Sequence, residues 1–170
     1  MSSPRDTMQH LFSCFDTMYA TLGESAPMLH NDAFVIRTYE MGRSFGEVAL
    51  RFRTYLGDVA NERVLSLEEV LLRAVASDES GAMVLFAVAT LVGPRVLVSL
   101  RDARDAGGLD ESALEVLNDA SQVLVREILR VGEVAKAQAP IEDGRWQEVA
   151  RSLGEALDEA GNAESFGISR

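Results

Sequence analysis

Apolar residues recur every three or four positions in several stretches of the chain, which predicts amphipathic helices there. The clearest repeat begins near Asp110, a suitable N-cap residue, and continues to Ala139, where Pro140 stops it. Ser66 and Glu69 match a capping box at the start of a shorter repeat. The pattern predicts helices over residues 5–22, 67–77, 110–139 and 144–160.

Two periodicities compete between residues 34 and 56. As a helix, this stretch places apolar side chains every three or four residues, whereas its second half also divides into two faces with a period of two. Gly42 and Gly46 would each cost a helix about 1 kcal/mol relative to alanine. The first half is rich in β-branched and aromatic residues, which fit pleated sheets. We therefore expect a hairpin rather than one long helix over 33–60, with strand, loop and strand at 34–41, 42–46 and 47–56.

A second hairpin is predicted around a Gly-Pro pair. Residues 82–92 are apolar on every face, as a buried strand or a buried helix would be. Gly93-Pro94 is a turn signal, and residues 95–101 are short and rich in valine, which favours a strand. With a short extra strand near residues 62–65, we expect an α+β fold. Its antiparallel sheet would have about five strands in two hairpins, packed with three to four helices.

The length of the chain fits a single core. A chain of 170 residues buries roughly 70% of the surface that it exposes when unfolded. We expect one α+β domain over residues 1–140, an appended C-terminal helix over 141–160 and a loose tail over 161–170.

Composition and charge exclude several classes of protein. With 16 basic and 27 acidic side chains the net charge is -11, which argues against direct nucleic-acid binding, because phosphate contacts need concentrated Lys and Arg. The single cysteine, Cys14, excludes an internal disulfide and a Cys-rich zinc site. The apolar run 82–92, stopped by Pro94 and Arg95, is shorter than the roughly 20 residues of a membrane span. We expect an acidic cytoplasmic protein without membrane insertion.

One sequence pattern has the form of a catalytic motif. Gly42-Arg-Ser44-Phe-Gly46 matches G-x-S-x-G, the nucleophile elbow, which needs a strand before it, a helix after it and a histidine later in the chain. The histidines, His10 and His30, both precede Ser44. We interpret the match as a coincidence.

A second pattern joins a thiol and an imidazole. His10 and Cys14 share a helix face, where they could form a thiolate–imidazole pair or half a metal site. No second ligand pair has useful spacing, so a buried structural thiol is favoured. Glu-x-x-His pairs and phosphate-binding glycine loops are also missing from the sequence. We therefore expect no cofactor, no metal and no enzymatic activity.

The expected order of elements resembles that of the class I type III secretion chaperones and their broad-specificity relatives. The likeness covers about residues 5–138 and includes Leu71-Leu-Arg-Ala74 at the end of the middle helix and the segment from Gly93 to Leu100. The resemblance implies a cytoplasmic homodimer with a role in virulence. It would bind effector proteins as clients and keep them competent for secretion.

The resemblance also implies two sets of residues. Apolar side chains of the first helix and the sheet would bind the client, and residues of the middle helix would form the dimer interface. The client set is Leu11, Phe12, Phe15, Met18, Leu50 and Phe52, and the dimer set is Val70, Leu71 and Val75. Each of the client residues could instead fill the core.

Two other functions are compatible with the sequence. The main alternative is an all-α regulatory adaptor or anti-activator that binds another protein, in which residues 33–60 form one long helix. A helical sensor of a small ligand would need an apolar pocket, which a sequence does not reveal.

Overall fold

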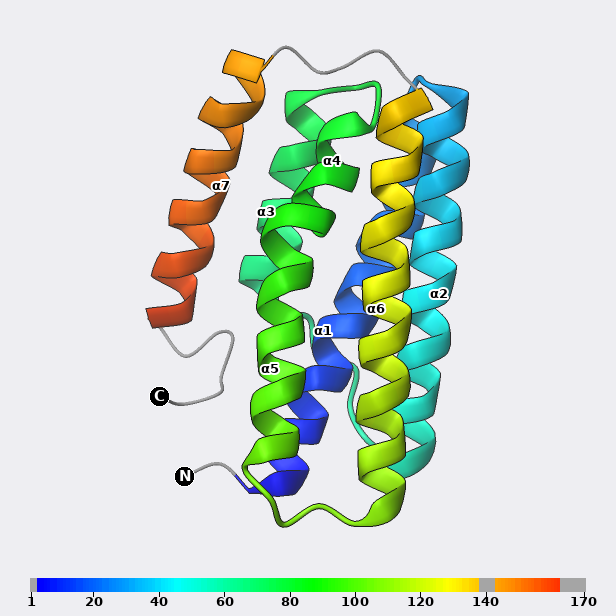
Figure 1. Cartoon of the computed structure of the whole chain (residues 1–170), viewed down its shortest axis with the longest axis vertical. Coiled ribbons are helices and arrows are strands. Elements are labelled where there is room, and N and C mark those ends of the chain that lie inside the picture. Colours follow the sequence, from blue (N-terminus) through cyan, green and yellow to red (C-terminus); the bar gives the residue numbers. More distant parts are fainter. Residues whose placement is uncertain (1–2, 138–142, 163–170) are drawn as a thin grey trace.

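The computed structural model describes residues 3–137 and 143–162, and within these ranges it contains helices and no strand (Figure 1). The structure is 86% helical, so the predicted α+β fold with a five-stranded sheet is wrong. The elements are α1 (Pro4–Ser25), the 3-10 turn η1 (Ala26–Met28), α2 (Asp32–Leu56), α3 (Leu65–Ser77), α4 (Ala82–Ala87), the π-helical segment η2 (Val88–Val92), α5 (Gly93–Asp105), α6 (Glu111–Ala137) and α7 (Asp143–Asn162).

The predicted helices are confirmed where the periodicity was unambiguous. They correspond to α1, α3, α6 and α7, although residues 138 and 139 lie outside the described residues. The capping box at Ser66 and Glu69 is wrong, because α3 begins at Leu65, two residues earlier than predicted, and its N-cap, Val64, makes no side-chain cap. A capping box is found at α1, where Ser3 Oγ accepts from the backbone N–H of Asp6 at 3.1 Å.

The first predicted hairpin is wrong, because residues 34–56 lie in the single helix α2. Asn31 caps this helix by accepting from the backbone N–H of Phe34 at 3.2 Å. The cost of the two glycines to helix stability is compensated by close packing against α1. A Cβ on Gly46 would lie 2.7 Å from Cδ2 of Tyr19, and one on Gly42 would lie 3.4 Å from Cβ of Leu22. The packing of α1 on α2 thus offsets the local cost of glycine.

The second predicted hairpin is also wrong, because residues 82–105 form one continuous helical run. A proline in a regular α-helix lacks its N–H and clashes with the carbonyl four residues earlier. Here the turn before Pro94 widens into η2, where the N–H of Gly93 donates to the carbonyl oxygen of Val88. Gly-Pro therefore marks a π-bulge rather than a chain reversal. The strand expected near residues 62–65 is the segment that leads into α3.

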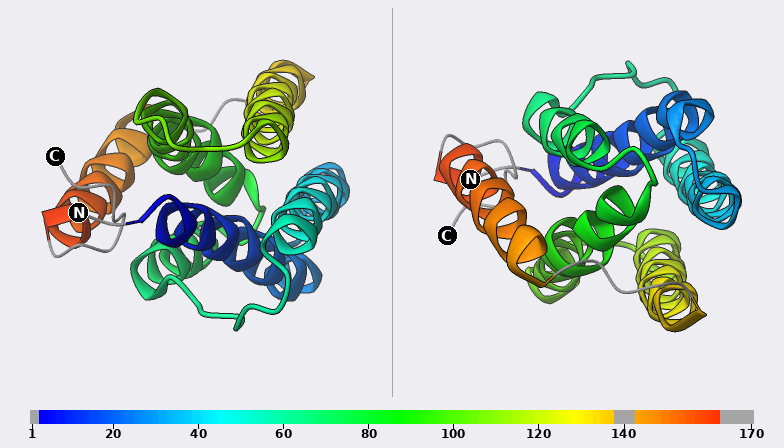
Figure 2. Two further views of the ribbon diagram at one scale, coloured as in Figure 1. Left: turned by 90° about the horizontal axis from the view of Figure 1, so that it is seen from below. Right: turned by 90° about the horizontal axis from the view of Figure 1, so that it is seen from above.

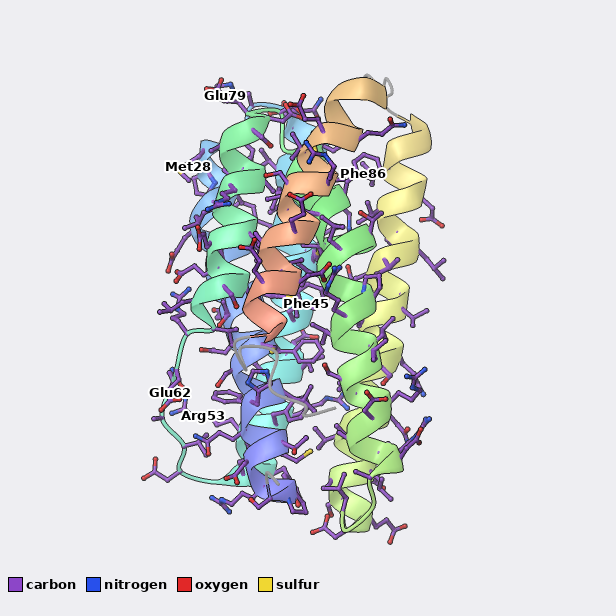
Figure 3. The ribbon with its side chains drawn as sticks, turned by 90° about the vertical axis from the view of Figure 1, so that its left-hand side faces the viewer. Met28, Phe45, Arg53, Glu62, Glu79 and Phe86 are labelled. Atoms are coloured by element: carbon purple, nitrogen blue, oxygen red, sulfur yellow. The ribbon has the colours of Figure 1, made fainter. Side chains whose placement is uncertain are left out.

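α1 lies in the middle of the bundle, with α2, α3 and α5 around it (Figure 2). Its inner face places Phe15 against two aromatic rings of α2. The centroid of the Phe15 ring is 5.8 Å from that of Phe45, edge to face, and 5.9 Å from that of Phe52, stacked. Phe45 points into the interior (Figure 3). This cluster is the centre of the hydrophobic core.

The continuous run over residues 82–105 is long and apolar enough to cross a membrane by length and composition. The prediction that Pro94 interrupts it is wrong. In the structure, 56% of its most apolar window is buried inside the bundle.

α7 lies at the edge of the bundle, on the side away from α2 (Figures 1 and 2). It packs mainly on α3 and also touches α4 and η2. Two leucines, Leu153 and Leu157, are its buried side chains among those described. Full burial of a leucine contributes about 1.5–3 kcal/mol. The helix predicted over residues 144–160 therefore exists and is attached along one narrow apolar seam.

The π-bulge gives a test with a matched control. A Cβ on Gly93 would lie 2.7 Å from the carbonyl oxygen of Val88 and 2.8 Å from Cδ1 of Ile128. Gly93→Ala should therefore lower the free energy of unfolding by about 1–3 kcal/mol. Gly132→Ala adds the same methyl group to α6, where no atom lies within 4 Å, and should raise it by about 0.5–1 kcal/mol. Urea denaturation measures both. Equal effects of the two substitutions would contradict the packing described for Gly93.

Candidate functional site

An open groove of about 640 Å³ runs along the outer side of the seam between α1 and α2. It takes one face from each of the two helices. The lining residues are Phe12, Asp16, Tyr19 and Gly23 of α1 and Tyr39, Gly42, Arg43, Gly46, Glu47, Ala49, Leu50 and Arg53 of α2. We refer to it as the α1–α2 groove.

Two glycines of α2, Gly42 and Gly46, belong to the lining of the groove. Gly42 and Gly46 are four residues apart, so they share one face of the helix. The ring of Tyr19 lies against Gly46, in the space that a side chain at that position would need, and so forms part of the groove wall. Tyr19, Tyr39 and Leu50 are 48%, 47% and 63% exposed, an unusual set of large apolar groups to leave in water.

Charged groups of both signs flank these apolar side chains. The guanidinium of Arg43 pairs with the carboxylate of Glu47, with Nε and Oε1 3.4 Å apart. Asp16 and Arg53 form no salt bridge with any other described residue. Two charges of opposite sign are therefore free to meet a partner, next to tyrosine and leucine side chains. Tyrosine and arginine are enriched in protein–protein interfaces.

The structure separates the predicted client-binding residues into two groups. Leu50 projects from the groove, and Phe12 lines its floor with 1% of its surface exposed. The other four, Leu11, Phe15, Met18 and Phe52, are fully buried in the core. Within one folded chain those four are not accessible to a client. The groove instead uses Tyr19 and Tyr39, which the sequence reasoning did not single out.

The predicted dimer residues also lie inside the chain. Val70, Leu71 and Val75 of α3 are buried in the hydrophobic core, and α3 packs against α1 and α7. Their burial is complete without a second copy of the chain, so the homodimer stays a prediction.

A second cluster of functional groups lies on the opposite side of α2, where it meets α6. Glu127 is fully buried and forms an ion pair with Nη2 of Arg37, which is 4% exposed. The same carboxylate accepts from Ser44 Oγ at 3.0 Å, Arg126 Nε at 3.3 Å and Arg130 Nη1 at 3.4 Å. These donors compensate the loss of water around the buried charge.

Burial lowers the pKa of the Arg37 guanidinium, and the neighbouring carboxylate of Glu40 opposes this effect. Nη1 of Arg37 donates to Oε2 of Glu40 at 2.8 Å, so each charge of the cluster has a partner of opposite sign. Arg51 and Asp119 form a further ion pair between α2 and α6 nearer the other end. The two helices therefore run antiparallel and are joined by charged groups at two levels.

The geometry of this cluster does not support catalysis by Ser44. The residue lies in the middle of α2 rather than on a strand-to-helix turn, so the elbow interpretation is excluded. Its hydroxyl donates to Glu127, and neither histidine belongs to the cluster. The cluster has the composition of a structural link between two helices.

The thiol of Cys14 is buried. Its Sγ lies 3.6 Å from Nε2 of His10, but burial raises the pKa of the thiol to about 12 and lowers that of the imidazole. At neutral pH the sulfur therefore stays protonated and is a poor nucleophile. Among the described residues, no three His, Cys, Asp or Glu side chains lie close enough to hold a metal ion.

Comparisons of the chain with models of known protein families, with curated proteins and with solved structures found no match. The functional conclusion therefore depends on the geometry of the chain itself.

The buried ion pair predicts that removing one of its two charges lowers folding stability more than removing both. Glu127→Ala leaves the buried guanidinium of Arg37 with only the more exposed Glu40 as a partner and should cost about 3–5 kcal/mol of folding stability. The double variant Arg37→Met/Glu127→Leu removes both charges and should cost less than that single change. Glu133→Ala, at an exposed position on the same helix, should change stability by less than about 0.5 kcal/mol. Urea denaturation of the four chains decides. A Glu127→Ala variant as stable as Glu133→Ala would show that the pair does not hold α2 to α6.

The raised pKa of the Cys14 thiol predicts that the folded protein resists thiol reagents. The reactive form is the thiolate, which at pH 8 makes up about 10⁻⁴ of a thiol whose pKa is about 12. We expect a disulfide dye to label the native chain at least about 100-fold more slowly than the chain unfolded in urea. Rapid labelling at pH 8 under native conditions would contradict the burial of this side chain.

Proposed function

We propose that the protein is a non-catalytic, all-helical adaptor that binds another protein through the α1–α2 groove. The supporting observation is the hollow between these helices, with half-exposed Tyr19 and Tyr39 and the more exposed Leu50 along it. Aromatic side chains provide large contact areas at a small cost in conformational entropy, which is why they dominate binding energy at interfaces.

The dimensions of the groove favour a peptide segment as ligand. From Tyr39 to Arg53 the lining of α2 spans fourteen residue steps, or roughly 21 Å along the helix axis. A partner helix of about four turns fits this length. Its apolar face would cover Tyr19 and Leu50, and its charged groups would meet Asp16 and Arg53.

We prefer the all-α adaptor, the main alternative from the sequence, to the secretion chaperone. The resemblance to the chaperones depended on two hairpins, and the described residues contain none. The long-helix alternative for residues 33–60 agrees with α2 over Asp32–Leu56. A cytoplasmic location, regulation as the outcome of binding and a homodimeric state belong to the proposal as expectations.

Two charge-introducing variants test the proposal. Leu50→Glu places a carboxylate in the groove, whereas Leu129→Glu makes the same change at a leucine of matched exposure on α6, with 63% and 66% of the two side chains exposed. Both positions are at the surface, so stability should change by less than about 0.5 kcal/mol. In capture from cells that express the chain naturally, we expect a protein partner to be retained by the wild type and by Leu129→Glu. Its recovery should fall at least about tenfold with Leu50→Glu.

Reconstitution with the purified partner then gives the dissociation constants by calorimetry. Equal binding by the wild type and Leu50→Glu, or equal loss with both variants, would show that the groove is not the contact surface. Capture of a small molecule in place of a protein would support the hypothesis of a ligand sensor and contradict the hypothesis of an adaptor.

A further inference from the structure

α7 is an amphipathic helix at the edge of the bundle, and its buried leucines join the margin of the hydrophobic core. The aromatic cluster of the core belongs to α1 and α2, whereas α7 contacts α3, α4 and η2 (Figure 3). Leu153 and Leu157, one helical turn apart, are 2% and 1% exposed. Among the α7 side chains that the structure describes, Val149 and Ala156 are partly buried against the core.

The outward face of α7 is acidic, and one of its charges anchors the helix. Asp158 follows Leu157 directly, and its Oδ1 accepts from Nη2 of Arg95 at 2.6 Å. The same guanidinium donates through Nη1 to the carbonyl oxygen of Leu91 at 3.0 Å. Arg95 is thus held at the surface of the bundle in a position that recognises a carboxylate one residue after the second leucine.

The surface beneath α7 therefore binds a short, defined pattern of side chains. It receives two leucines spaced by four residues and an aspartate that follows the second one, while an acidic outer face stays in water. Any amphipathic helix with this pattern presents the same groups as α7. Phe86 of α4, partly buried, lies beside α7 on this side of the molecule (Figure 3).

We propose that the surface formed by α3, α4 and η2, with Arg95 at its edge, is a binding site for an acidic amphipathic helix of a partner protein. α7 is its intramolecular occupant. α7 lies on the side of the molecule away from α2 (Figure 2), and no lining residue of the α1–α2 groove belongs to α3, α4 or η2, so the site does not depend on the function proposed for that groove. A tethered helix has an effective concentration in the millimolar range, so a partner helix binds with full affinity only when α7 is displaced.

The test uses the full-length chain and a fluorescently labelled peptide of residues 143–162 as the probe. Leu153→Glu/Leu157→Glu in the chain removes the two anchors of its own α7. We expect this variant to bind the peptide at least about tenfold more tightly than the wild type does, measured by fluorescence anisotropy, because the internal competitor is gone. The peptide keeps both leucines.

A charge exchange makes the result specific. Added to the undocked variant, Arg95→Glu should weaken binding of the natural peptide by about threefold to tenfold. A peptide with Asp158→Arg should recover the loss on this chain and bind less well to the chain that keeps Arg95. A matched control peptide, Glu148→Arg, changes an exposed acid of the same helix and should give no such recovery.

Three results would overturn the inference. The first is that the Leu153→Glu/Leu157→Glu variant does not bind the peptide although it keeps its helical circular dichroism and unfolds cooperatively. The second is an undocked variant that no longer unfolds cooperatively, which would show that the bundle does not fold without a docked α7. The third is a dimer by light scattering that exchanges α7 between two copies, which would make a second copy the occupant. None of these results bears on the Leu50→Glu test of the groove.

Discussion

The close approach of α1 and α2 at Gly42 and Gly46 is the contact on which the rest of the structure depends. With no side chains there, the two helices meet near Tyr19 and Leu22, and this brings Phe15 against Phe45 and Phe52. The same two glycines, with Tyr19, line the α1–α2 groove. One sequence feature thus belongs both to the packing of the core and to the lining of the candidate binding surface.

The other side of α2 is fixed by charge rather than by close packing. A fully buried carboxylate, that of Glu127, meets Arg37, and further donors come from Ser44, Arg126 and Arg130. Such a pair is costly to bury but even more costly to break, and it admits few alternative arrangements of the two helices. α2 is therefore held on one side by its packing on α1 and on the other by the ion pair with α6. Both contacts position α2, which forms one of the two walls of the groove.

The sequence predicted the helices whose apolar period had no competitor, and it failed where a local cost was offset by a distant contact. Gly42 and Gly46 argued against a helix only because the packing of Tyr19 and Leu22 is not visible in the sequence. Gly93-Pro94 indicated a turn because proline does not fit a regular α-helix. A π-bulge accommodates the same proline inside a continuous helical run, and the sequence does not distinguish the two. The spacing of the two glycines was the one available signal for close helix packing.

The candidate binding surface was only partly predictable. Leu50 and Phe12 were among the predicted contact residues, but hydrophobicity alone did not separate them from Phe15 and Phe52, which fill the core. Tyr19 and Tyr39 come from different helices, so no local pattern joins them. Arg37, the ion-pair partner of Glu127, is also distant in the sequence. The one sequence signal for this buried pair was a glutamate at a position on the apolar stripe of α6.

Tyrosine footprinting tests the central claim, that a partner protein occupies the α1–α2 groove, most directly. The chain has three tyrosines: Tyr19 and Tyr39 line the groove, and Tyr55, outside it, reaches toward Asp110. Oxidative labelling of the free chain and of its complex with the purified partner, read residue by residue by mass spectrometry, compares all three in one experiment. The account predicts that labelling of Tyr19 and Tyr39 falls sharply in the complex while that of Tyr55 is unchanged. Unchanged labelling of Tyr19 and Tyr39 in a saturated complex would contradict it.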